Sequence, residues 1–469
     1  MSARAWGGRK AVGSRLGPWP RLALAALAAL GLGCMDSRST EPSTVDPAFA
    51  KAGGASDPTV ESADPATSPQ DTTLDIHVFG SNYDAGSRVD FARGGVVDSK
   101  LQVNSTTYRS SRELVANVTV APDAATVSYD IVVTKSTGKK GIGTEKFAVL
   151  VQGEMLSSPS GQSWATSVSE NGLVSGYVMG ICGTVQGAVL WDQLGQLTVL
   201  PAVPGTCGSV ARDVNSSGVA VGRAFGSNSS ESVDVRWLPS GGTYQAESLP
   251  RLPDGSLSLA IRINEAGLIV AANAAAVWSE TTGWQMLPRP SGATTCRGGA
   301  INDIGAIAGT CTIAGQDQAV YWPSVSGSPV VLPLPVNGGH PDVGAINDIG
   351  MIVGSVAITM RTNGSRNALW RAIRWNPSGG SWTSELLPDL GKGGHAEAIN
   401  DAGQIAGAVF GTNDSPVPVL WETSGARRQL DTGDRGGQAH GLAEPAAGSV
   451  VVGAIDIPTQ SWHAARWRP

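Results

Sequence analysis

The sequence predicts an all-β protein in which a small β-sandwich is followed by a seven-bladed β-propeller. Three observations support this: a motif that recurs seven times between Ser163 and the C-terminus, a run of short alternating strands before it, and 61 glycines with only 15% charged residues in a chain of 469. Sequence repeats with periods of roughly 20–50 residues indicate a repeat architecture. Many short strands also need many tight turns, which glycine supplies.

The first 33 residues predict a signal peptide for export. Basic residues up to Arg21 precede an apolar run from Leu22 to Leu32, the order found in secretory signals, and the run is too short to span a membrane. The residues around Cys34 resemble the bacterial lipobox, although Gly31 stands where that family usually has Leu. The resemblance implies a lipid on Cys34, which would hold the exported protein on the outer membrane or cell surface. A plain secretory cleavage, giving an extracellular protein, and an uncleaved hydrophobic anchor are the alternatives.

The net charge argues against one class of partner. Without the five basic residues of the signal peptide, 28 basic residues face 39 acidic ones, so the net charge falls from −6 to −11. A nucleic-acid-binding domain needs a basic surface. We therefore expect no nucleic-acid partner, and contact with a membrane through the lipid anchor only.

Residues 34–70 predict a disordered tether. Ser, Thr, Pro, Asp and Ala dominate this segment, and large apolar residues are almost absent. Such a segment cannot bury enough apolar surface to fold. It would lift the folded part of the chain away from a membrane surface.

Residues 71–152 predict a small antiparallel sandwich, because alternating strands are separated there by Gly, Asn and Asp. The predicted strands are Thr73–Phe79, Arg88–Phe91, Lys100–Val103, Glu113–Val120, Thr126–Lys135 and Glu145–Val151. The phrases from Val78 to Tyr83, Glu113 to Ala116 and Tyr129 to Val133 resemble the IPT/TIG type of immunoglobulin-like (Ig-like) domain. In that family such modules are spacers or contact domains, so the resemblance implies no catalysis.

Residues 153–469 predict the propeller. The repeated motif reads Ile/Val-Asn-Asp-x-Gly-x-Ile/Val-x-Gly, and an apolar run ending in Trp and a Leu-Pro segment follow it; the clearest copies begin at Ile301, Ile346 and Ile399. Asn, Asp and Gly tolerate positive φ, so the motif predicts a tight hairpin between the first two strands. Each copy contains four strands in all, and seven such copies describe a seven-bladed propeller. The matching tryptophans are Trp191, Trp237, Trp278, Trp322, Trp375, Trp421 and Trp467.

The two ends of this region predict closure of the ring. The last copy stops after Trp467 without a fourth strand, whereas residues 154–161 parallel the fourth-strand segment at 285–292. We therefore expect the N-terminal segment to complete the last blade and leave no open edge.

Four cysteines remain if Cys34 is lipidated, an even number for an oxidising compartment. Cys296 and Cys311 lie symmetrically about the turn at 302–305, so they should face each other across a hairpin and form a disulfide. Cys182 and Cys207 are a second candidate pair. A metal site is the competing interpretation, and the lack of CxxC or His spacing argues against it.

The block Gly-Gly-x-x-x-Ala-Ile-Asn-Asp-x-Gly-x-Ile-x-Gly, with its later Ala-x-x-Trp and Leu-Pro, resembles the extracellular repeat called HAF, found in secreted bacterial proteins. The His-Ala-Phe that names the repeat is not intact, since one equivalent stretch reads Ala188-Val189-Leu190-Trp191. The resemblance implies a propeller-like surface protein without an established activity. It does not imply an enzyme.

Motifs that carry enzyme chemistry are missing. The sequence has no HExxH, GxSxG, P-loop or complete GxGxxG motif and only five histidines, so we expect no catalytic residue, no cofactor and no metal. Asp303, Asp348 and Asp401 lie in the motif turns, where a structural role is expected. Carboxylates from distant blades could still form a glycosidase-type pair.

One group of residues predicts a binding site. The longest loop between second and third strands runs from Ala357 to Trp370, and the connections on either side of that blade should share its face. An aromatic ring beside arginines can stack on a sugar and bind a carboxylate or phosphate, which suggests an anionic glycan or peptide; a solvated hairpin is the alternative. The candidate residues are Arg361, Arg366, Trp370, Arg371, His340 and His395.

Taken together, these features predict a monomeric bacterial surface lipoprotein whose propeller is a non-catalytic binding module for a cell-surface glycan or a protein. An extracellular polysaccharide hydrolase or lyase, with acids in the propeller funnel, is one alternative. A structural surface protein without a dedicated ligand is the other. Clustered acids in the funnel would favour the enzyme, whereas an aromatic and arginine rim would favour binding.

Overall fold

The structure, a computed structural model, describes residues 56–159, 161–179, 187–226, 232–362, 365–411, 414–433, 435–443, 448–457 and 461–469. Cys34, Cys182 and the predicted signal peptide lie outside these ranges. The regular structure inside them consists of strands. No helix in the described ranges has the length and hydropathy that crossing a membrane requires.

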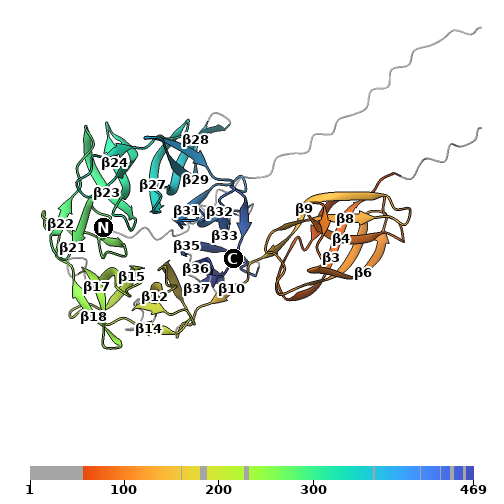
Figure 1. The fold of residues 1–469 in the computed structure, drawn as a ribbon, viewed down its shortest axis with the longest axis horizontal. Coiled ribbons are helices and arrows are strands. Elements are labelled where there is room, and N and C mark those ends of the chain that lie inside the picture. Colours follow the sequence, from red (N-terminus) through yellow and green to blue (C-terminus); the bar gives the residue numbers. More distant parts are fainter. Residues whose placement is uncertain are drawn as a thin grey trace, which may run out of the picture. The chain divides into compact units, whose positions relative to one another are not determined.

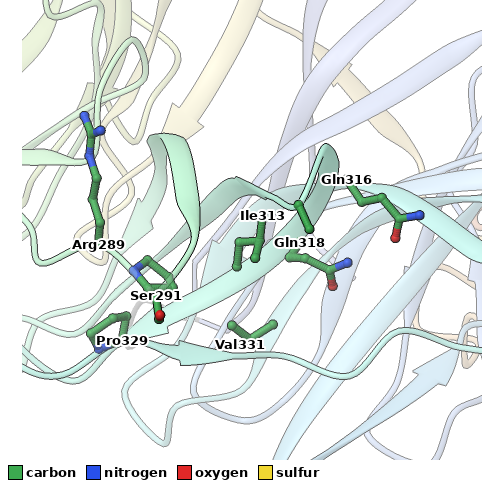
Figure 2. Close-up of a pocket in the computed structure, with 9 residues that line it drawn as sticks. Arg289, Ser291, Ile313, Gln316, Gln318, Pro329 and Val331 are labelled. Carbon is green, nitrogen blue, oxygen red and sulfur yellow. The ribbon is translucent and has the colours of Figure 1, made fainter.

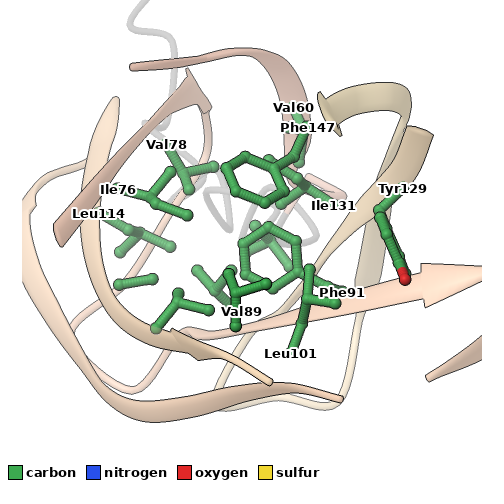
Figure 3. Close-up of a cluster of buried hydrophobic side chains, with 14 of the residues drawn as sticks. Val60, Ile76, Val78, Val89, Phe91, Leu101, Leu114, Tyr129, Ile131 and Phe147 are labelled. Carbon is green, nitrogen blue, oxygen red and sulfur yellow. The ribbon is translucent and has the colours of Figure 1, made fainter. Parts of the chain in front are cut away.

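The first nine strands form two sheets that enclose one apolar core (Figure 3). The strands are β1 (Thr59–Asp64), β3 (Thr72–Ser81), β7 (Glu113–Val120) and β6 (Leu101–Ser110) in one sheet, and β2 (Thr67–Pro69), β9 (Lys140–Leu150), β8 (Ser128–Thr134), β4 (Arg88–Arg93) and β5 (Val96–Val97) in the other. Ile76 and Leu114 enter the core from the first sheet, and Phe91 and Phe147 from the second, with ring centroids 5.1 Å apart. Alternate residues of each strand point inward, which makes this region the predicted sandwich.

The sandwich begins earlier than the sequence predicts. β1 pairs antiparallel with β3, and β2 runs parallel to β9, so the predicted tether at 34–70 is wrong for the residues of these two strands. Their side chains are largely polar and exposed, with Val60 and Ser68 buried. Backbone hydrogen bonds to the neighbouring strand fix β1 and β2 at the sheet edges, and such bonds cannot be predicted from amino-acid composition.

Residues 153–469 form seven four-stranded antiparallel sheets within the described ranges (Figure 1). In chain order, the first four are β11 (Ser163–Val168), β12 (Val174–Val178), β13 (Gly187–Trp191) and β14 (Leu197–Val199); β15 (Gly208–Val214), β16 (Ala220–Phe225), β17 (Val233–Ser240) and β18 (Thr243–Ser248); β19 (Ala260–Ile263), β20 (Ile269–Ala271), β21 (Ala276–Ser279) and β22 (Gly283–Met286); and β23 (Ala293–Ile301), β24 (Ile307–Ile313), β25 (Gln316–Trp322) and β26 (Val330–Val331). The remaining three are β27 (Gly338–Ile346), β28 (Ile352–Thr362), β29 (Ser365–Ser378) and β30 (Ser381–Leu386); β31 (Gly394–Ile399), β32 (Ile405–Phe410), β33 (Pro416–Trp421) and β34 (Arg427–Gln429); and β35 (Gly437–Ala443), β36 (Val450–Ile457), β37 (Ser461–Trp467) and β10 (Gly153–Met155). Each sheet packs on the next, and the last packs on the first through β36 and β11, which is the arrangement of a β-propeller.

The predicted closure of the ring is confirmed. β10 pairs with β37 in the register Gly153↔Trp467, Glu154↔Arg466 and Met155↔Ala465. Arg466 has a side chain only 2% exposed, and its Nη2 lies 2.8 Å from Glu154 Oε2. A buried cation needs such a partner, so an ion pair joins the two ends of this region.

The repeated motif links each sheet to its neighbour. Asn302 Nδ2 donates to the backbone oxygen of Asn347 at 2.9 Å, and Asn302 Oδ1 accepts from the N–H of Ala306 at 2.7 Å. Gly305 has a φ of 83°, and a Cβ at Gly309 would lie 2.2 Å from the oxygen of Arg297. The same side-chain amide bond runs from Asn215 to Asn264, from Asn264 to Asn302 and from Asn347 to Asn400.

The motif aspartates have a structural role of their own. Asp348 Oδ1 accepts from the N–H of Asp303 at 2.9 Å, and Asp401 Oδ1 accepts from the N–H of Asp348 at 2.8 Å. Each carboxylate therefore accepts a hydrogen bond from a backbone N–H in the turn of the preceding sheet. Without this bond, that N–H would have no partner. Burial, together with the charges of Asp348, Glu265 and Asp401, raises the pKa of Asp303, and its bond from the N–H of Glu265 works in the opposite direction.

The tryptophans of the repeat join the sheets on their outer side. Trp322 Nε1 donates to the oxygen of Pro288 at 2.7 Å, and Trp375 Nε1 donates to the oxygen of Pro333 at 2.8 Å, which explains the Leu-Pro segment of these repeats. Trp191 and Trp467 donate instead to the oxygens of Ser157 and Asp431, which stand where the other repeats have Pro. The third sheet differs. There Trp284 Nε1 donates to the oxygen of Pro250, and the guanidinium carbon of Arg236 lies 4.8 Å from the ring centroid of Trp278.

Cys296 and Cys311 are directly opposite each other in β23 and β24, and their sulfurs are bonded at 1.99 Å. Their symmetric spacing about the turn predicts this pairing. Cys207 is an exposed free thiol among the described residues. Its candidate partner Cys182 lies outside them, so that pairing stays a prediction.

Candidate functional site

All seven first strands contain one unpaired residue at the same place. The register of each strand against its second strand skips one residue, for example between Ala396 and Ala398 in β31. Such a β-bulge turns a side chain away from the ladder. The skipped residues are Thr166, Arg212, Ile261, Gly299, Gly344, Glu397 and His440.

The seven first strands surround a central cavity of about 110 Å³. Glu397 and His440 line it from their bulges, and Asp213 and Arg262 line it from the positions that follow the bulges of β15 and β19. Other strands contribute only small residues at these positions, such as Ala300 and Ala345. The charged groups are therefore concentrated on part of the channel wall.

The titratable groups in the channel differ in the hydrogen bonds that they make. Asp213 is buried and accepts from the backbone N–H groups of Val214 and Ile263, at 3.0 and 2.8 Å. Arg262 donates to the backbone oxygen of Ile261 at 3.1 Å. The described residues provide no hydrogen-bond partner for the side chains of Glu397 and His440. Groups of this kind are free to bind something that enters the channel.

The channel also shifts the protonation of its groups. Burial, with the nearby charge of Asp342, raises the pKa of Glu397 to about 7, although Arg262 works against this. Burial and the charges of Arg262 and Arg212 lower the pKa of His440 to about 4. At neutral pH His440 is therefore uncharged, and Glu397 is close to half protonated. Perturbed groups gathered in a cavity are typical of functional sites.

Glu397 should make the stability of the protein depend on pH. Its folded-state pKa is above the ordinary value of 4.5, so its stabilising contribution is complete at low pH and is lost as pH rises through about 7. Relative to Glu397→Gln, we expect wild type to lose roughly 1–3 kcal/mol of unfolding free energy between pH 5 and pH 8. His440 is present in both proteins and cancels in the difference. Chemical denaturation at both pH values would measure this, and parallel curves for the two proteins would contradict it.

The motif turns enclose a second cavity of about 130 Å³ at one end of the channel. Asn302, Asp303, Asn347, Asp348 and Asp401 line it, together with Glu170 and Glu265 from the weaker motif copies. The asparagines and aspartates already hold neighbouring sheets together, as described above. Within the described residues, no group of three or more His, Cys, Asp and Glu is placed to bind a metal ion.

The structure brings together two of the residues predicted to bind ligand. The rings of Trp370 and His395 lie 6.1 Å apart, and Phe410 packs edge-on against His395 at 5.7 Å. Burial lowers the pKa of His395, which Asp342 partly offsets. Arg371 is instead paired with Asp389, Nε to Oδ2 at 2.6 Å.

The other predicted ligand residues are arranged differently. His340 Nδ1 is 3.5 Å from Asp317 Oδ2 on β25, in the preceding sheet. Arg361 and Arg366 pair through their backbones in β28 and β29, and their side chains lie outside the described part of the structure. The predicted loop from Ala357 to Trp370 is wrong for the described residues there, because β28 and β29 continue their pairing to Thr362 and Ser365.

The channel residues Arg262, Glu397 and His440 were missed from sequence. No single repeat contains them together, because they come from three sheets. A signal was present, since aligned copies have small or apolar residues at the bulge in four of the seven strands.

A further cavity of about 640 Å³ lies on the sheet of β23–β26 (Figure 2). Its polar lining comes from Arg289, Ser291, Gln316 and Gln318. Arg289 Nη1 already donates to the oxygen of Thr294 at 3.0 Å. This cavity therefore lacks the unpartnered charges of the central channel.

No protein-family model and no curated protein matches the sequence. Among solved structures, a protein of unknown function from Bacteroides thetaiotaomicron aligns over 91% of this chain and 100% of its own, with 10% identity and a TM-score of 0.33. A gluconolactonase from Xanthomonas campestris covers 66% and 88%, with 14% identity and a TM-score of 0.32. A fucose-recognising six-bladed β-propeller lectin of Aleuria aurantia covers 66% and 93%, with 13% identity and a TM-score of 0.26. TM-scores this low do not establish a common fold, so the propeller rests on the strand pairing above.

Proposed function

We propose that the protein is an exported bacterial surface lipoprotein whose propeller is a non-catalytic binding module. In this proposal the seven sheets are the blades of one closed seven-bladed propeller. An Ig-like sandwich and the preceding tether connect it to a lipid on Cys34. The partner is a cell-surface glycan or protein, one polar group of which reaches the central channel.

The charged bulge residues carry this proposal. Packing does not require charge at the bulge, since Thr166, Ile261, Gly299 and Gly344 occupy it elsewhere in the ring. Polar side chains without partners cost free energy in a buried setting unless a ligand or water satisfies them. Their convergence on one cavity favours binding over a purely structural role.

The lipobox and HAF resemblances support the surface location in this proposal. A resident of an oxidising compartment can also keep a disulfide such as Cys296–Cys311, as exported proteins do.

A screen of the purified full chain against immobilised cell-surface glycans, cell-wall polymers and surface proteins would test the binding function. We expect at least one polymer to be retained at its original mass, and Glu397→Gln to weaken retention. Arg374→Gln is the matched control, because Arg374 pairs with Glu385 at 2.7 Å on the outer strands of another sheet. Failure of every polymer and of every surface protein to bind would contradict the proposal.

One observation favours the hydrolase as a second candidate. A carboxyl group with a pKa of about 7, as in Glu397, can donate or accept a proton at neutral pH. In the same screen a shortened polymer would identify an enzyme. If Glu397→Gln no longer shortened the polymer, Glu397 would be identified as the catalytic acid or base.

A further inference from the structure

We propose that the channel binds an anionic sugar, with the sugar ring held by aromatic side chains at the seam between the first and last sheets and its acidic group held by Arg212. This inference rests on the proposed binding function and specifies its ligand. The residues involved lie apart from those predicted from sequence around Trp370.

Three aromatic rings form a column at this seam. Trp164 on β11 stacks on Tyr177 of β12, with centroids 5.2 Å apart and planes 15° apart. Trp462 of β37 lies 6.2 Å from Trp164 on a plane tilted by 30°. All three are partly exposed, unlike the buried repeat tryptophans. Trp164 is the middle ring and holds the other two in place, while the outer rings of such a column present flat apolar surface that suits the C–H face of a pyranose.

The column lies at the end of the channel opposite the motif turns. Trp164 is the second residue of β11, whereas the turn at 169–172 follows the end of that strand. Trp462 is likewise the second residue of β37, and Tyr177 is next to last in β12. A ligand on these rings would therefore approach from the face where the second and third strands connect.

Arg212 places positive charge beside the column. It is the bulge residue of β15 and follows Ala211. The backbone oxygen of Ala211 accepts from Thr166 Oγ1 at 2.9 Å, and Thr166 is two residues along β11 from Trp164. Burial raises the pKa of Tyr177, and the positive charge of Arg212 has a smaller, opposite effect. No carboxylate is among the groups that act on Arg212, and the described residues give its side chain no hydrogen-bond partner. A guanidinium without a partner is suited to a carboxylate or sulfate.

Arg223 on the neighbouring strand β16 adds to the positive charge. Its Nε is buried and has no hydrogen-bond partner among the described residues, while its guanidinium carbon lies 5.7 Å from the ring centroid of Phe225. Asp234 is opposite Arg223 in β17. Its Oδ2 accepts from Ser258 Oγ at 2.7 Å and from the N–H of Leu259 at 2.9 Å, and its Oδ1 is buried without a hydrogen-bond partner in the described part of the chain, so Arg223 has a carboxylate across the strand. Arg212, which is exposed, is therefore the arginine that is available to an external anion.

The chemistry favours a sugar over an acidic peptide. A peptide that adds to a sheet needs a continuous free strand edge, but β11 has six residues and its register breaks at Thr166. A pyranose with a carboxylate or a sulfate matches both features of the site at once. Its ring would stack on the aromatic column, and its anionic group would form an ion pair with Arg212.

Isothermal titration calorimetry of the full chain would test this inference, with tetragalacturonate, a sulfated galactose tetramer, neutral galactotetraose and hexaglutamate as probes. We expect at least one anionic sugar to bind, and the neutral sugar and the peptide to bind at least ~10-fold more weakly. The two anionic sugars distinguish a carboxylate from a sulfate ligand. Equal or tighter binding of the neutral sugar or the peptide would overturn the proposal.

Two pairs of variants locate the site. Arg212→Gln and Trp164→Ala should each lower the affinity for the anionic sugar by ~10-fold or more. Arg212→Lys should retain part of that affinity. Arg289→Gln, in the cavity of Figure 2, and Trp382→Ala, whose ring packs 5.0 Å from Tyr321 on an outer strand, should bind like wild type. Circular dichroism would verify that each variant is folded.

The outcomes separate this inference from the proposed function. If Arg212→Gln and Trp164→Ala are folded and bind the sugar like wild type, this site is wrong while binding by the propeller stands. If the full chain binds none of the polymers and surface proteins of the earlier screen, the proposed function itself fails.

Discussion

Replacing Trp375 by Ala should lower the free energy of unfolding by about 3–5 kcal/mol, the cost of removing a buried aromatic side chain. Trp375 is fully buried, in a cluster that includes Ile352 and Ile373. The substitution leaves a cavity between two sheets, and the oxygen of Pro333 loses the indole donor at 2.8 Å. Guanidinium denaturation followed by circular dichroism would measure the loss.

Two control variants separate the causes of that loss. Trp375→Phe keeps most of the ring but removes the donor, so it should cost about 1–3 kcal/mol. Trp382→Ala removes a partly exposed ring from the outer strand of the same sheet, and it should cost clearly less than Trp375→Ala. Equal losses for Trp375→Ala and Trp382→Ala would show that the repeat tryptophans do not hold the sheets together.

Asn347→Ala should destabilise the protein by about 1–3 kcal/mol. The side chain is buried, its Nδ2 donates to the oxygen of Asn400 at 2.9 Å, and its Oδ1 accepts from the N–H of Met351 at 2.8 Å. Its removal leaves the N–H of Met351 without an acceptor, which costs about 1–3 kcal/mol, and takes one of two donors from the oxygen of Asn400, which keeps the N–H of Gly403 at 3.0 Å. Thermal and guanidinium unfolding of the variant would measure the effect.

Ile349→Ala is the matched control for this turn. Ile349 is 61% exposed, so its loss should change the free energy of unfolding by about 0.5 kcal/mol or less. A similar loss for both variants would mean that the asparagine bonds between the sheets contribute little. Asn302→Ala should repeat the effect of Asn347→Ala, because its two bonds have the same geometry.

Features with local spacing could be predicted from the sequence. The turn motif, the recurrent Trp, the partner of β37 and the Cys296–Cys311 bond all depend on short segments whose spacing is visible in one or two repeats. The Asn and Gly of the motif were recognised as turn residues, but their bonds to the next sheet were not, because those bonds depend on how the sheets pack.

Features that depend on assembly could not be predicted. β1 and β2 are polar edge strands, and only their backbone pairing identifies them. The titratable groups of Arg262, Glu397 and His440 come together in the channel only when distant strands meet around one axis. The stack of Trp164 and Trp462 joins residues from the two ends of the propeller, which no local pattern relates.

The pairing of β10 with β37 has a consequence for biosynthesis. β10 emerges from the ribosome with the first propeller residues, but its partner strand β37 is made about 300 residues later. Throughout that interval Glu154 lacks Arg466, β10 has no partner strand, and the first sheet lacks the cover that β36 later gives β11, so other chains can add there. A ribosome stalled before residue 461 would therefore release an open arc of sheets, which we expect to be a substrate for chaperones and proteases, while a chain that includes β37 closes on itself.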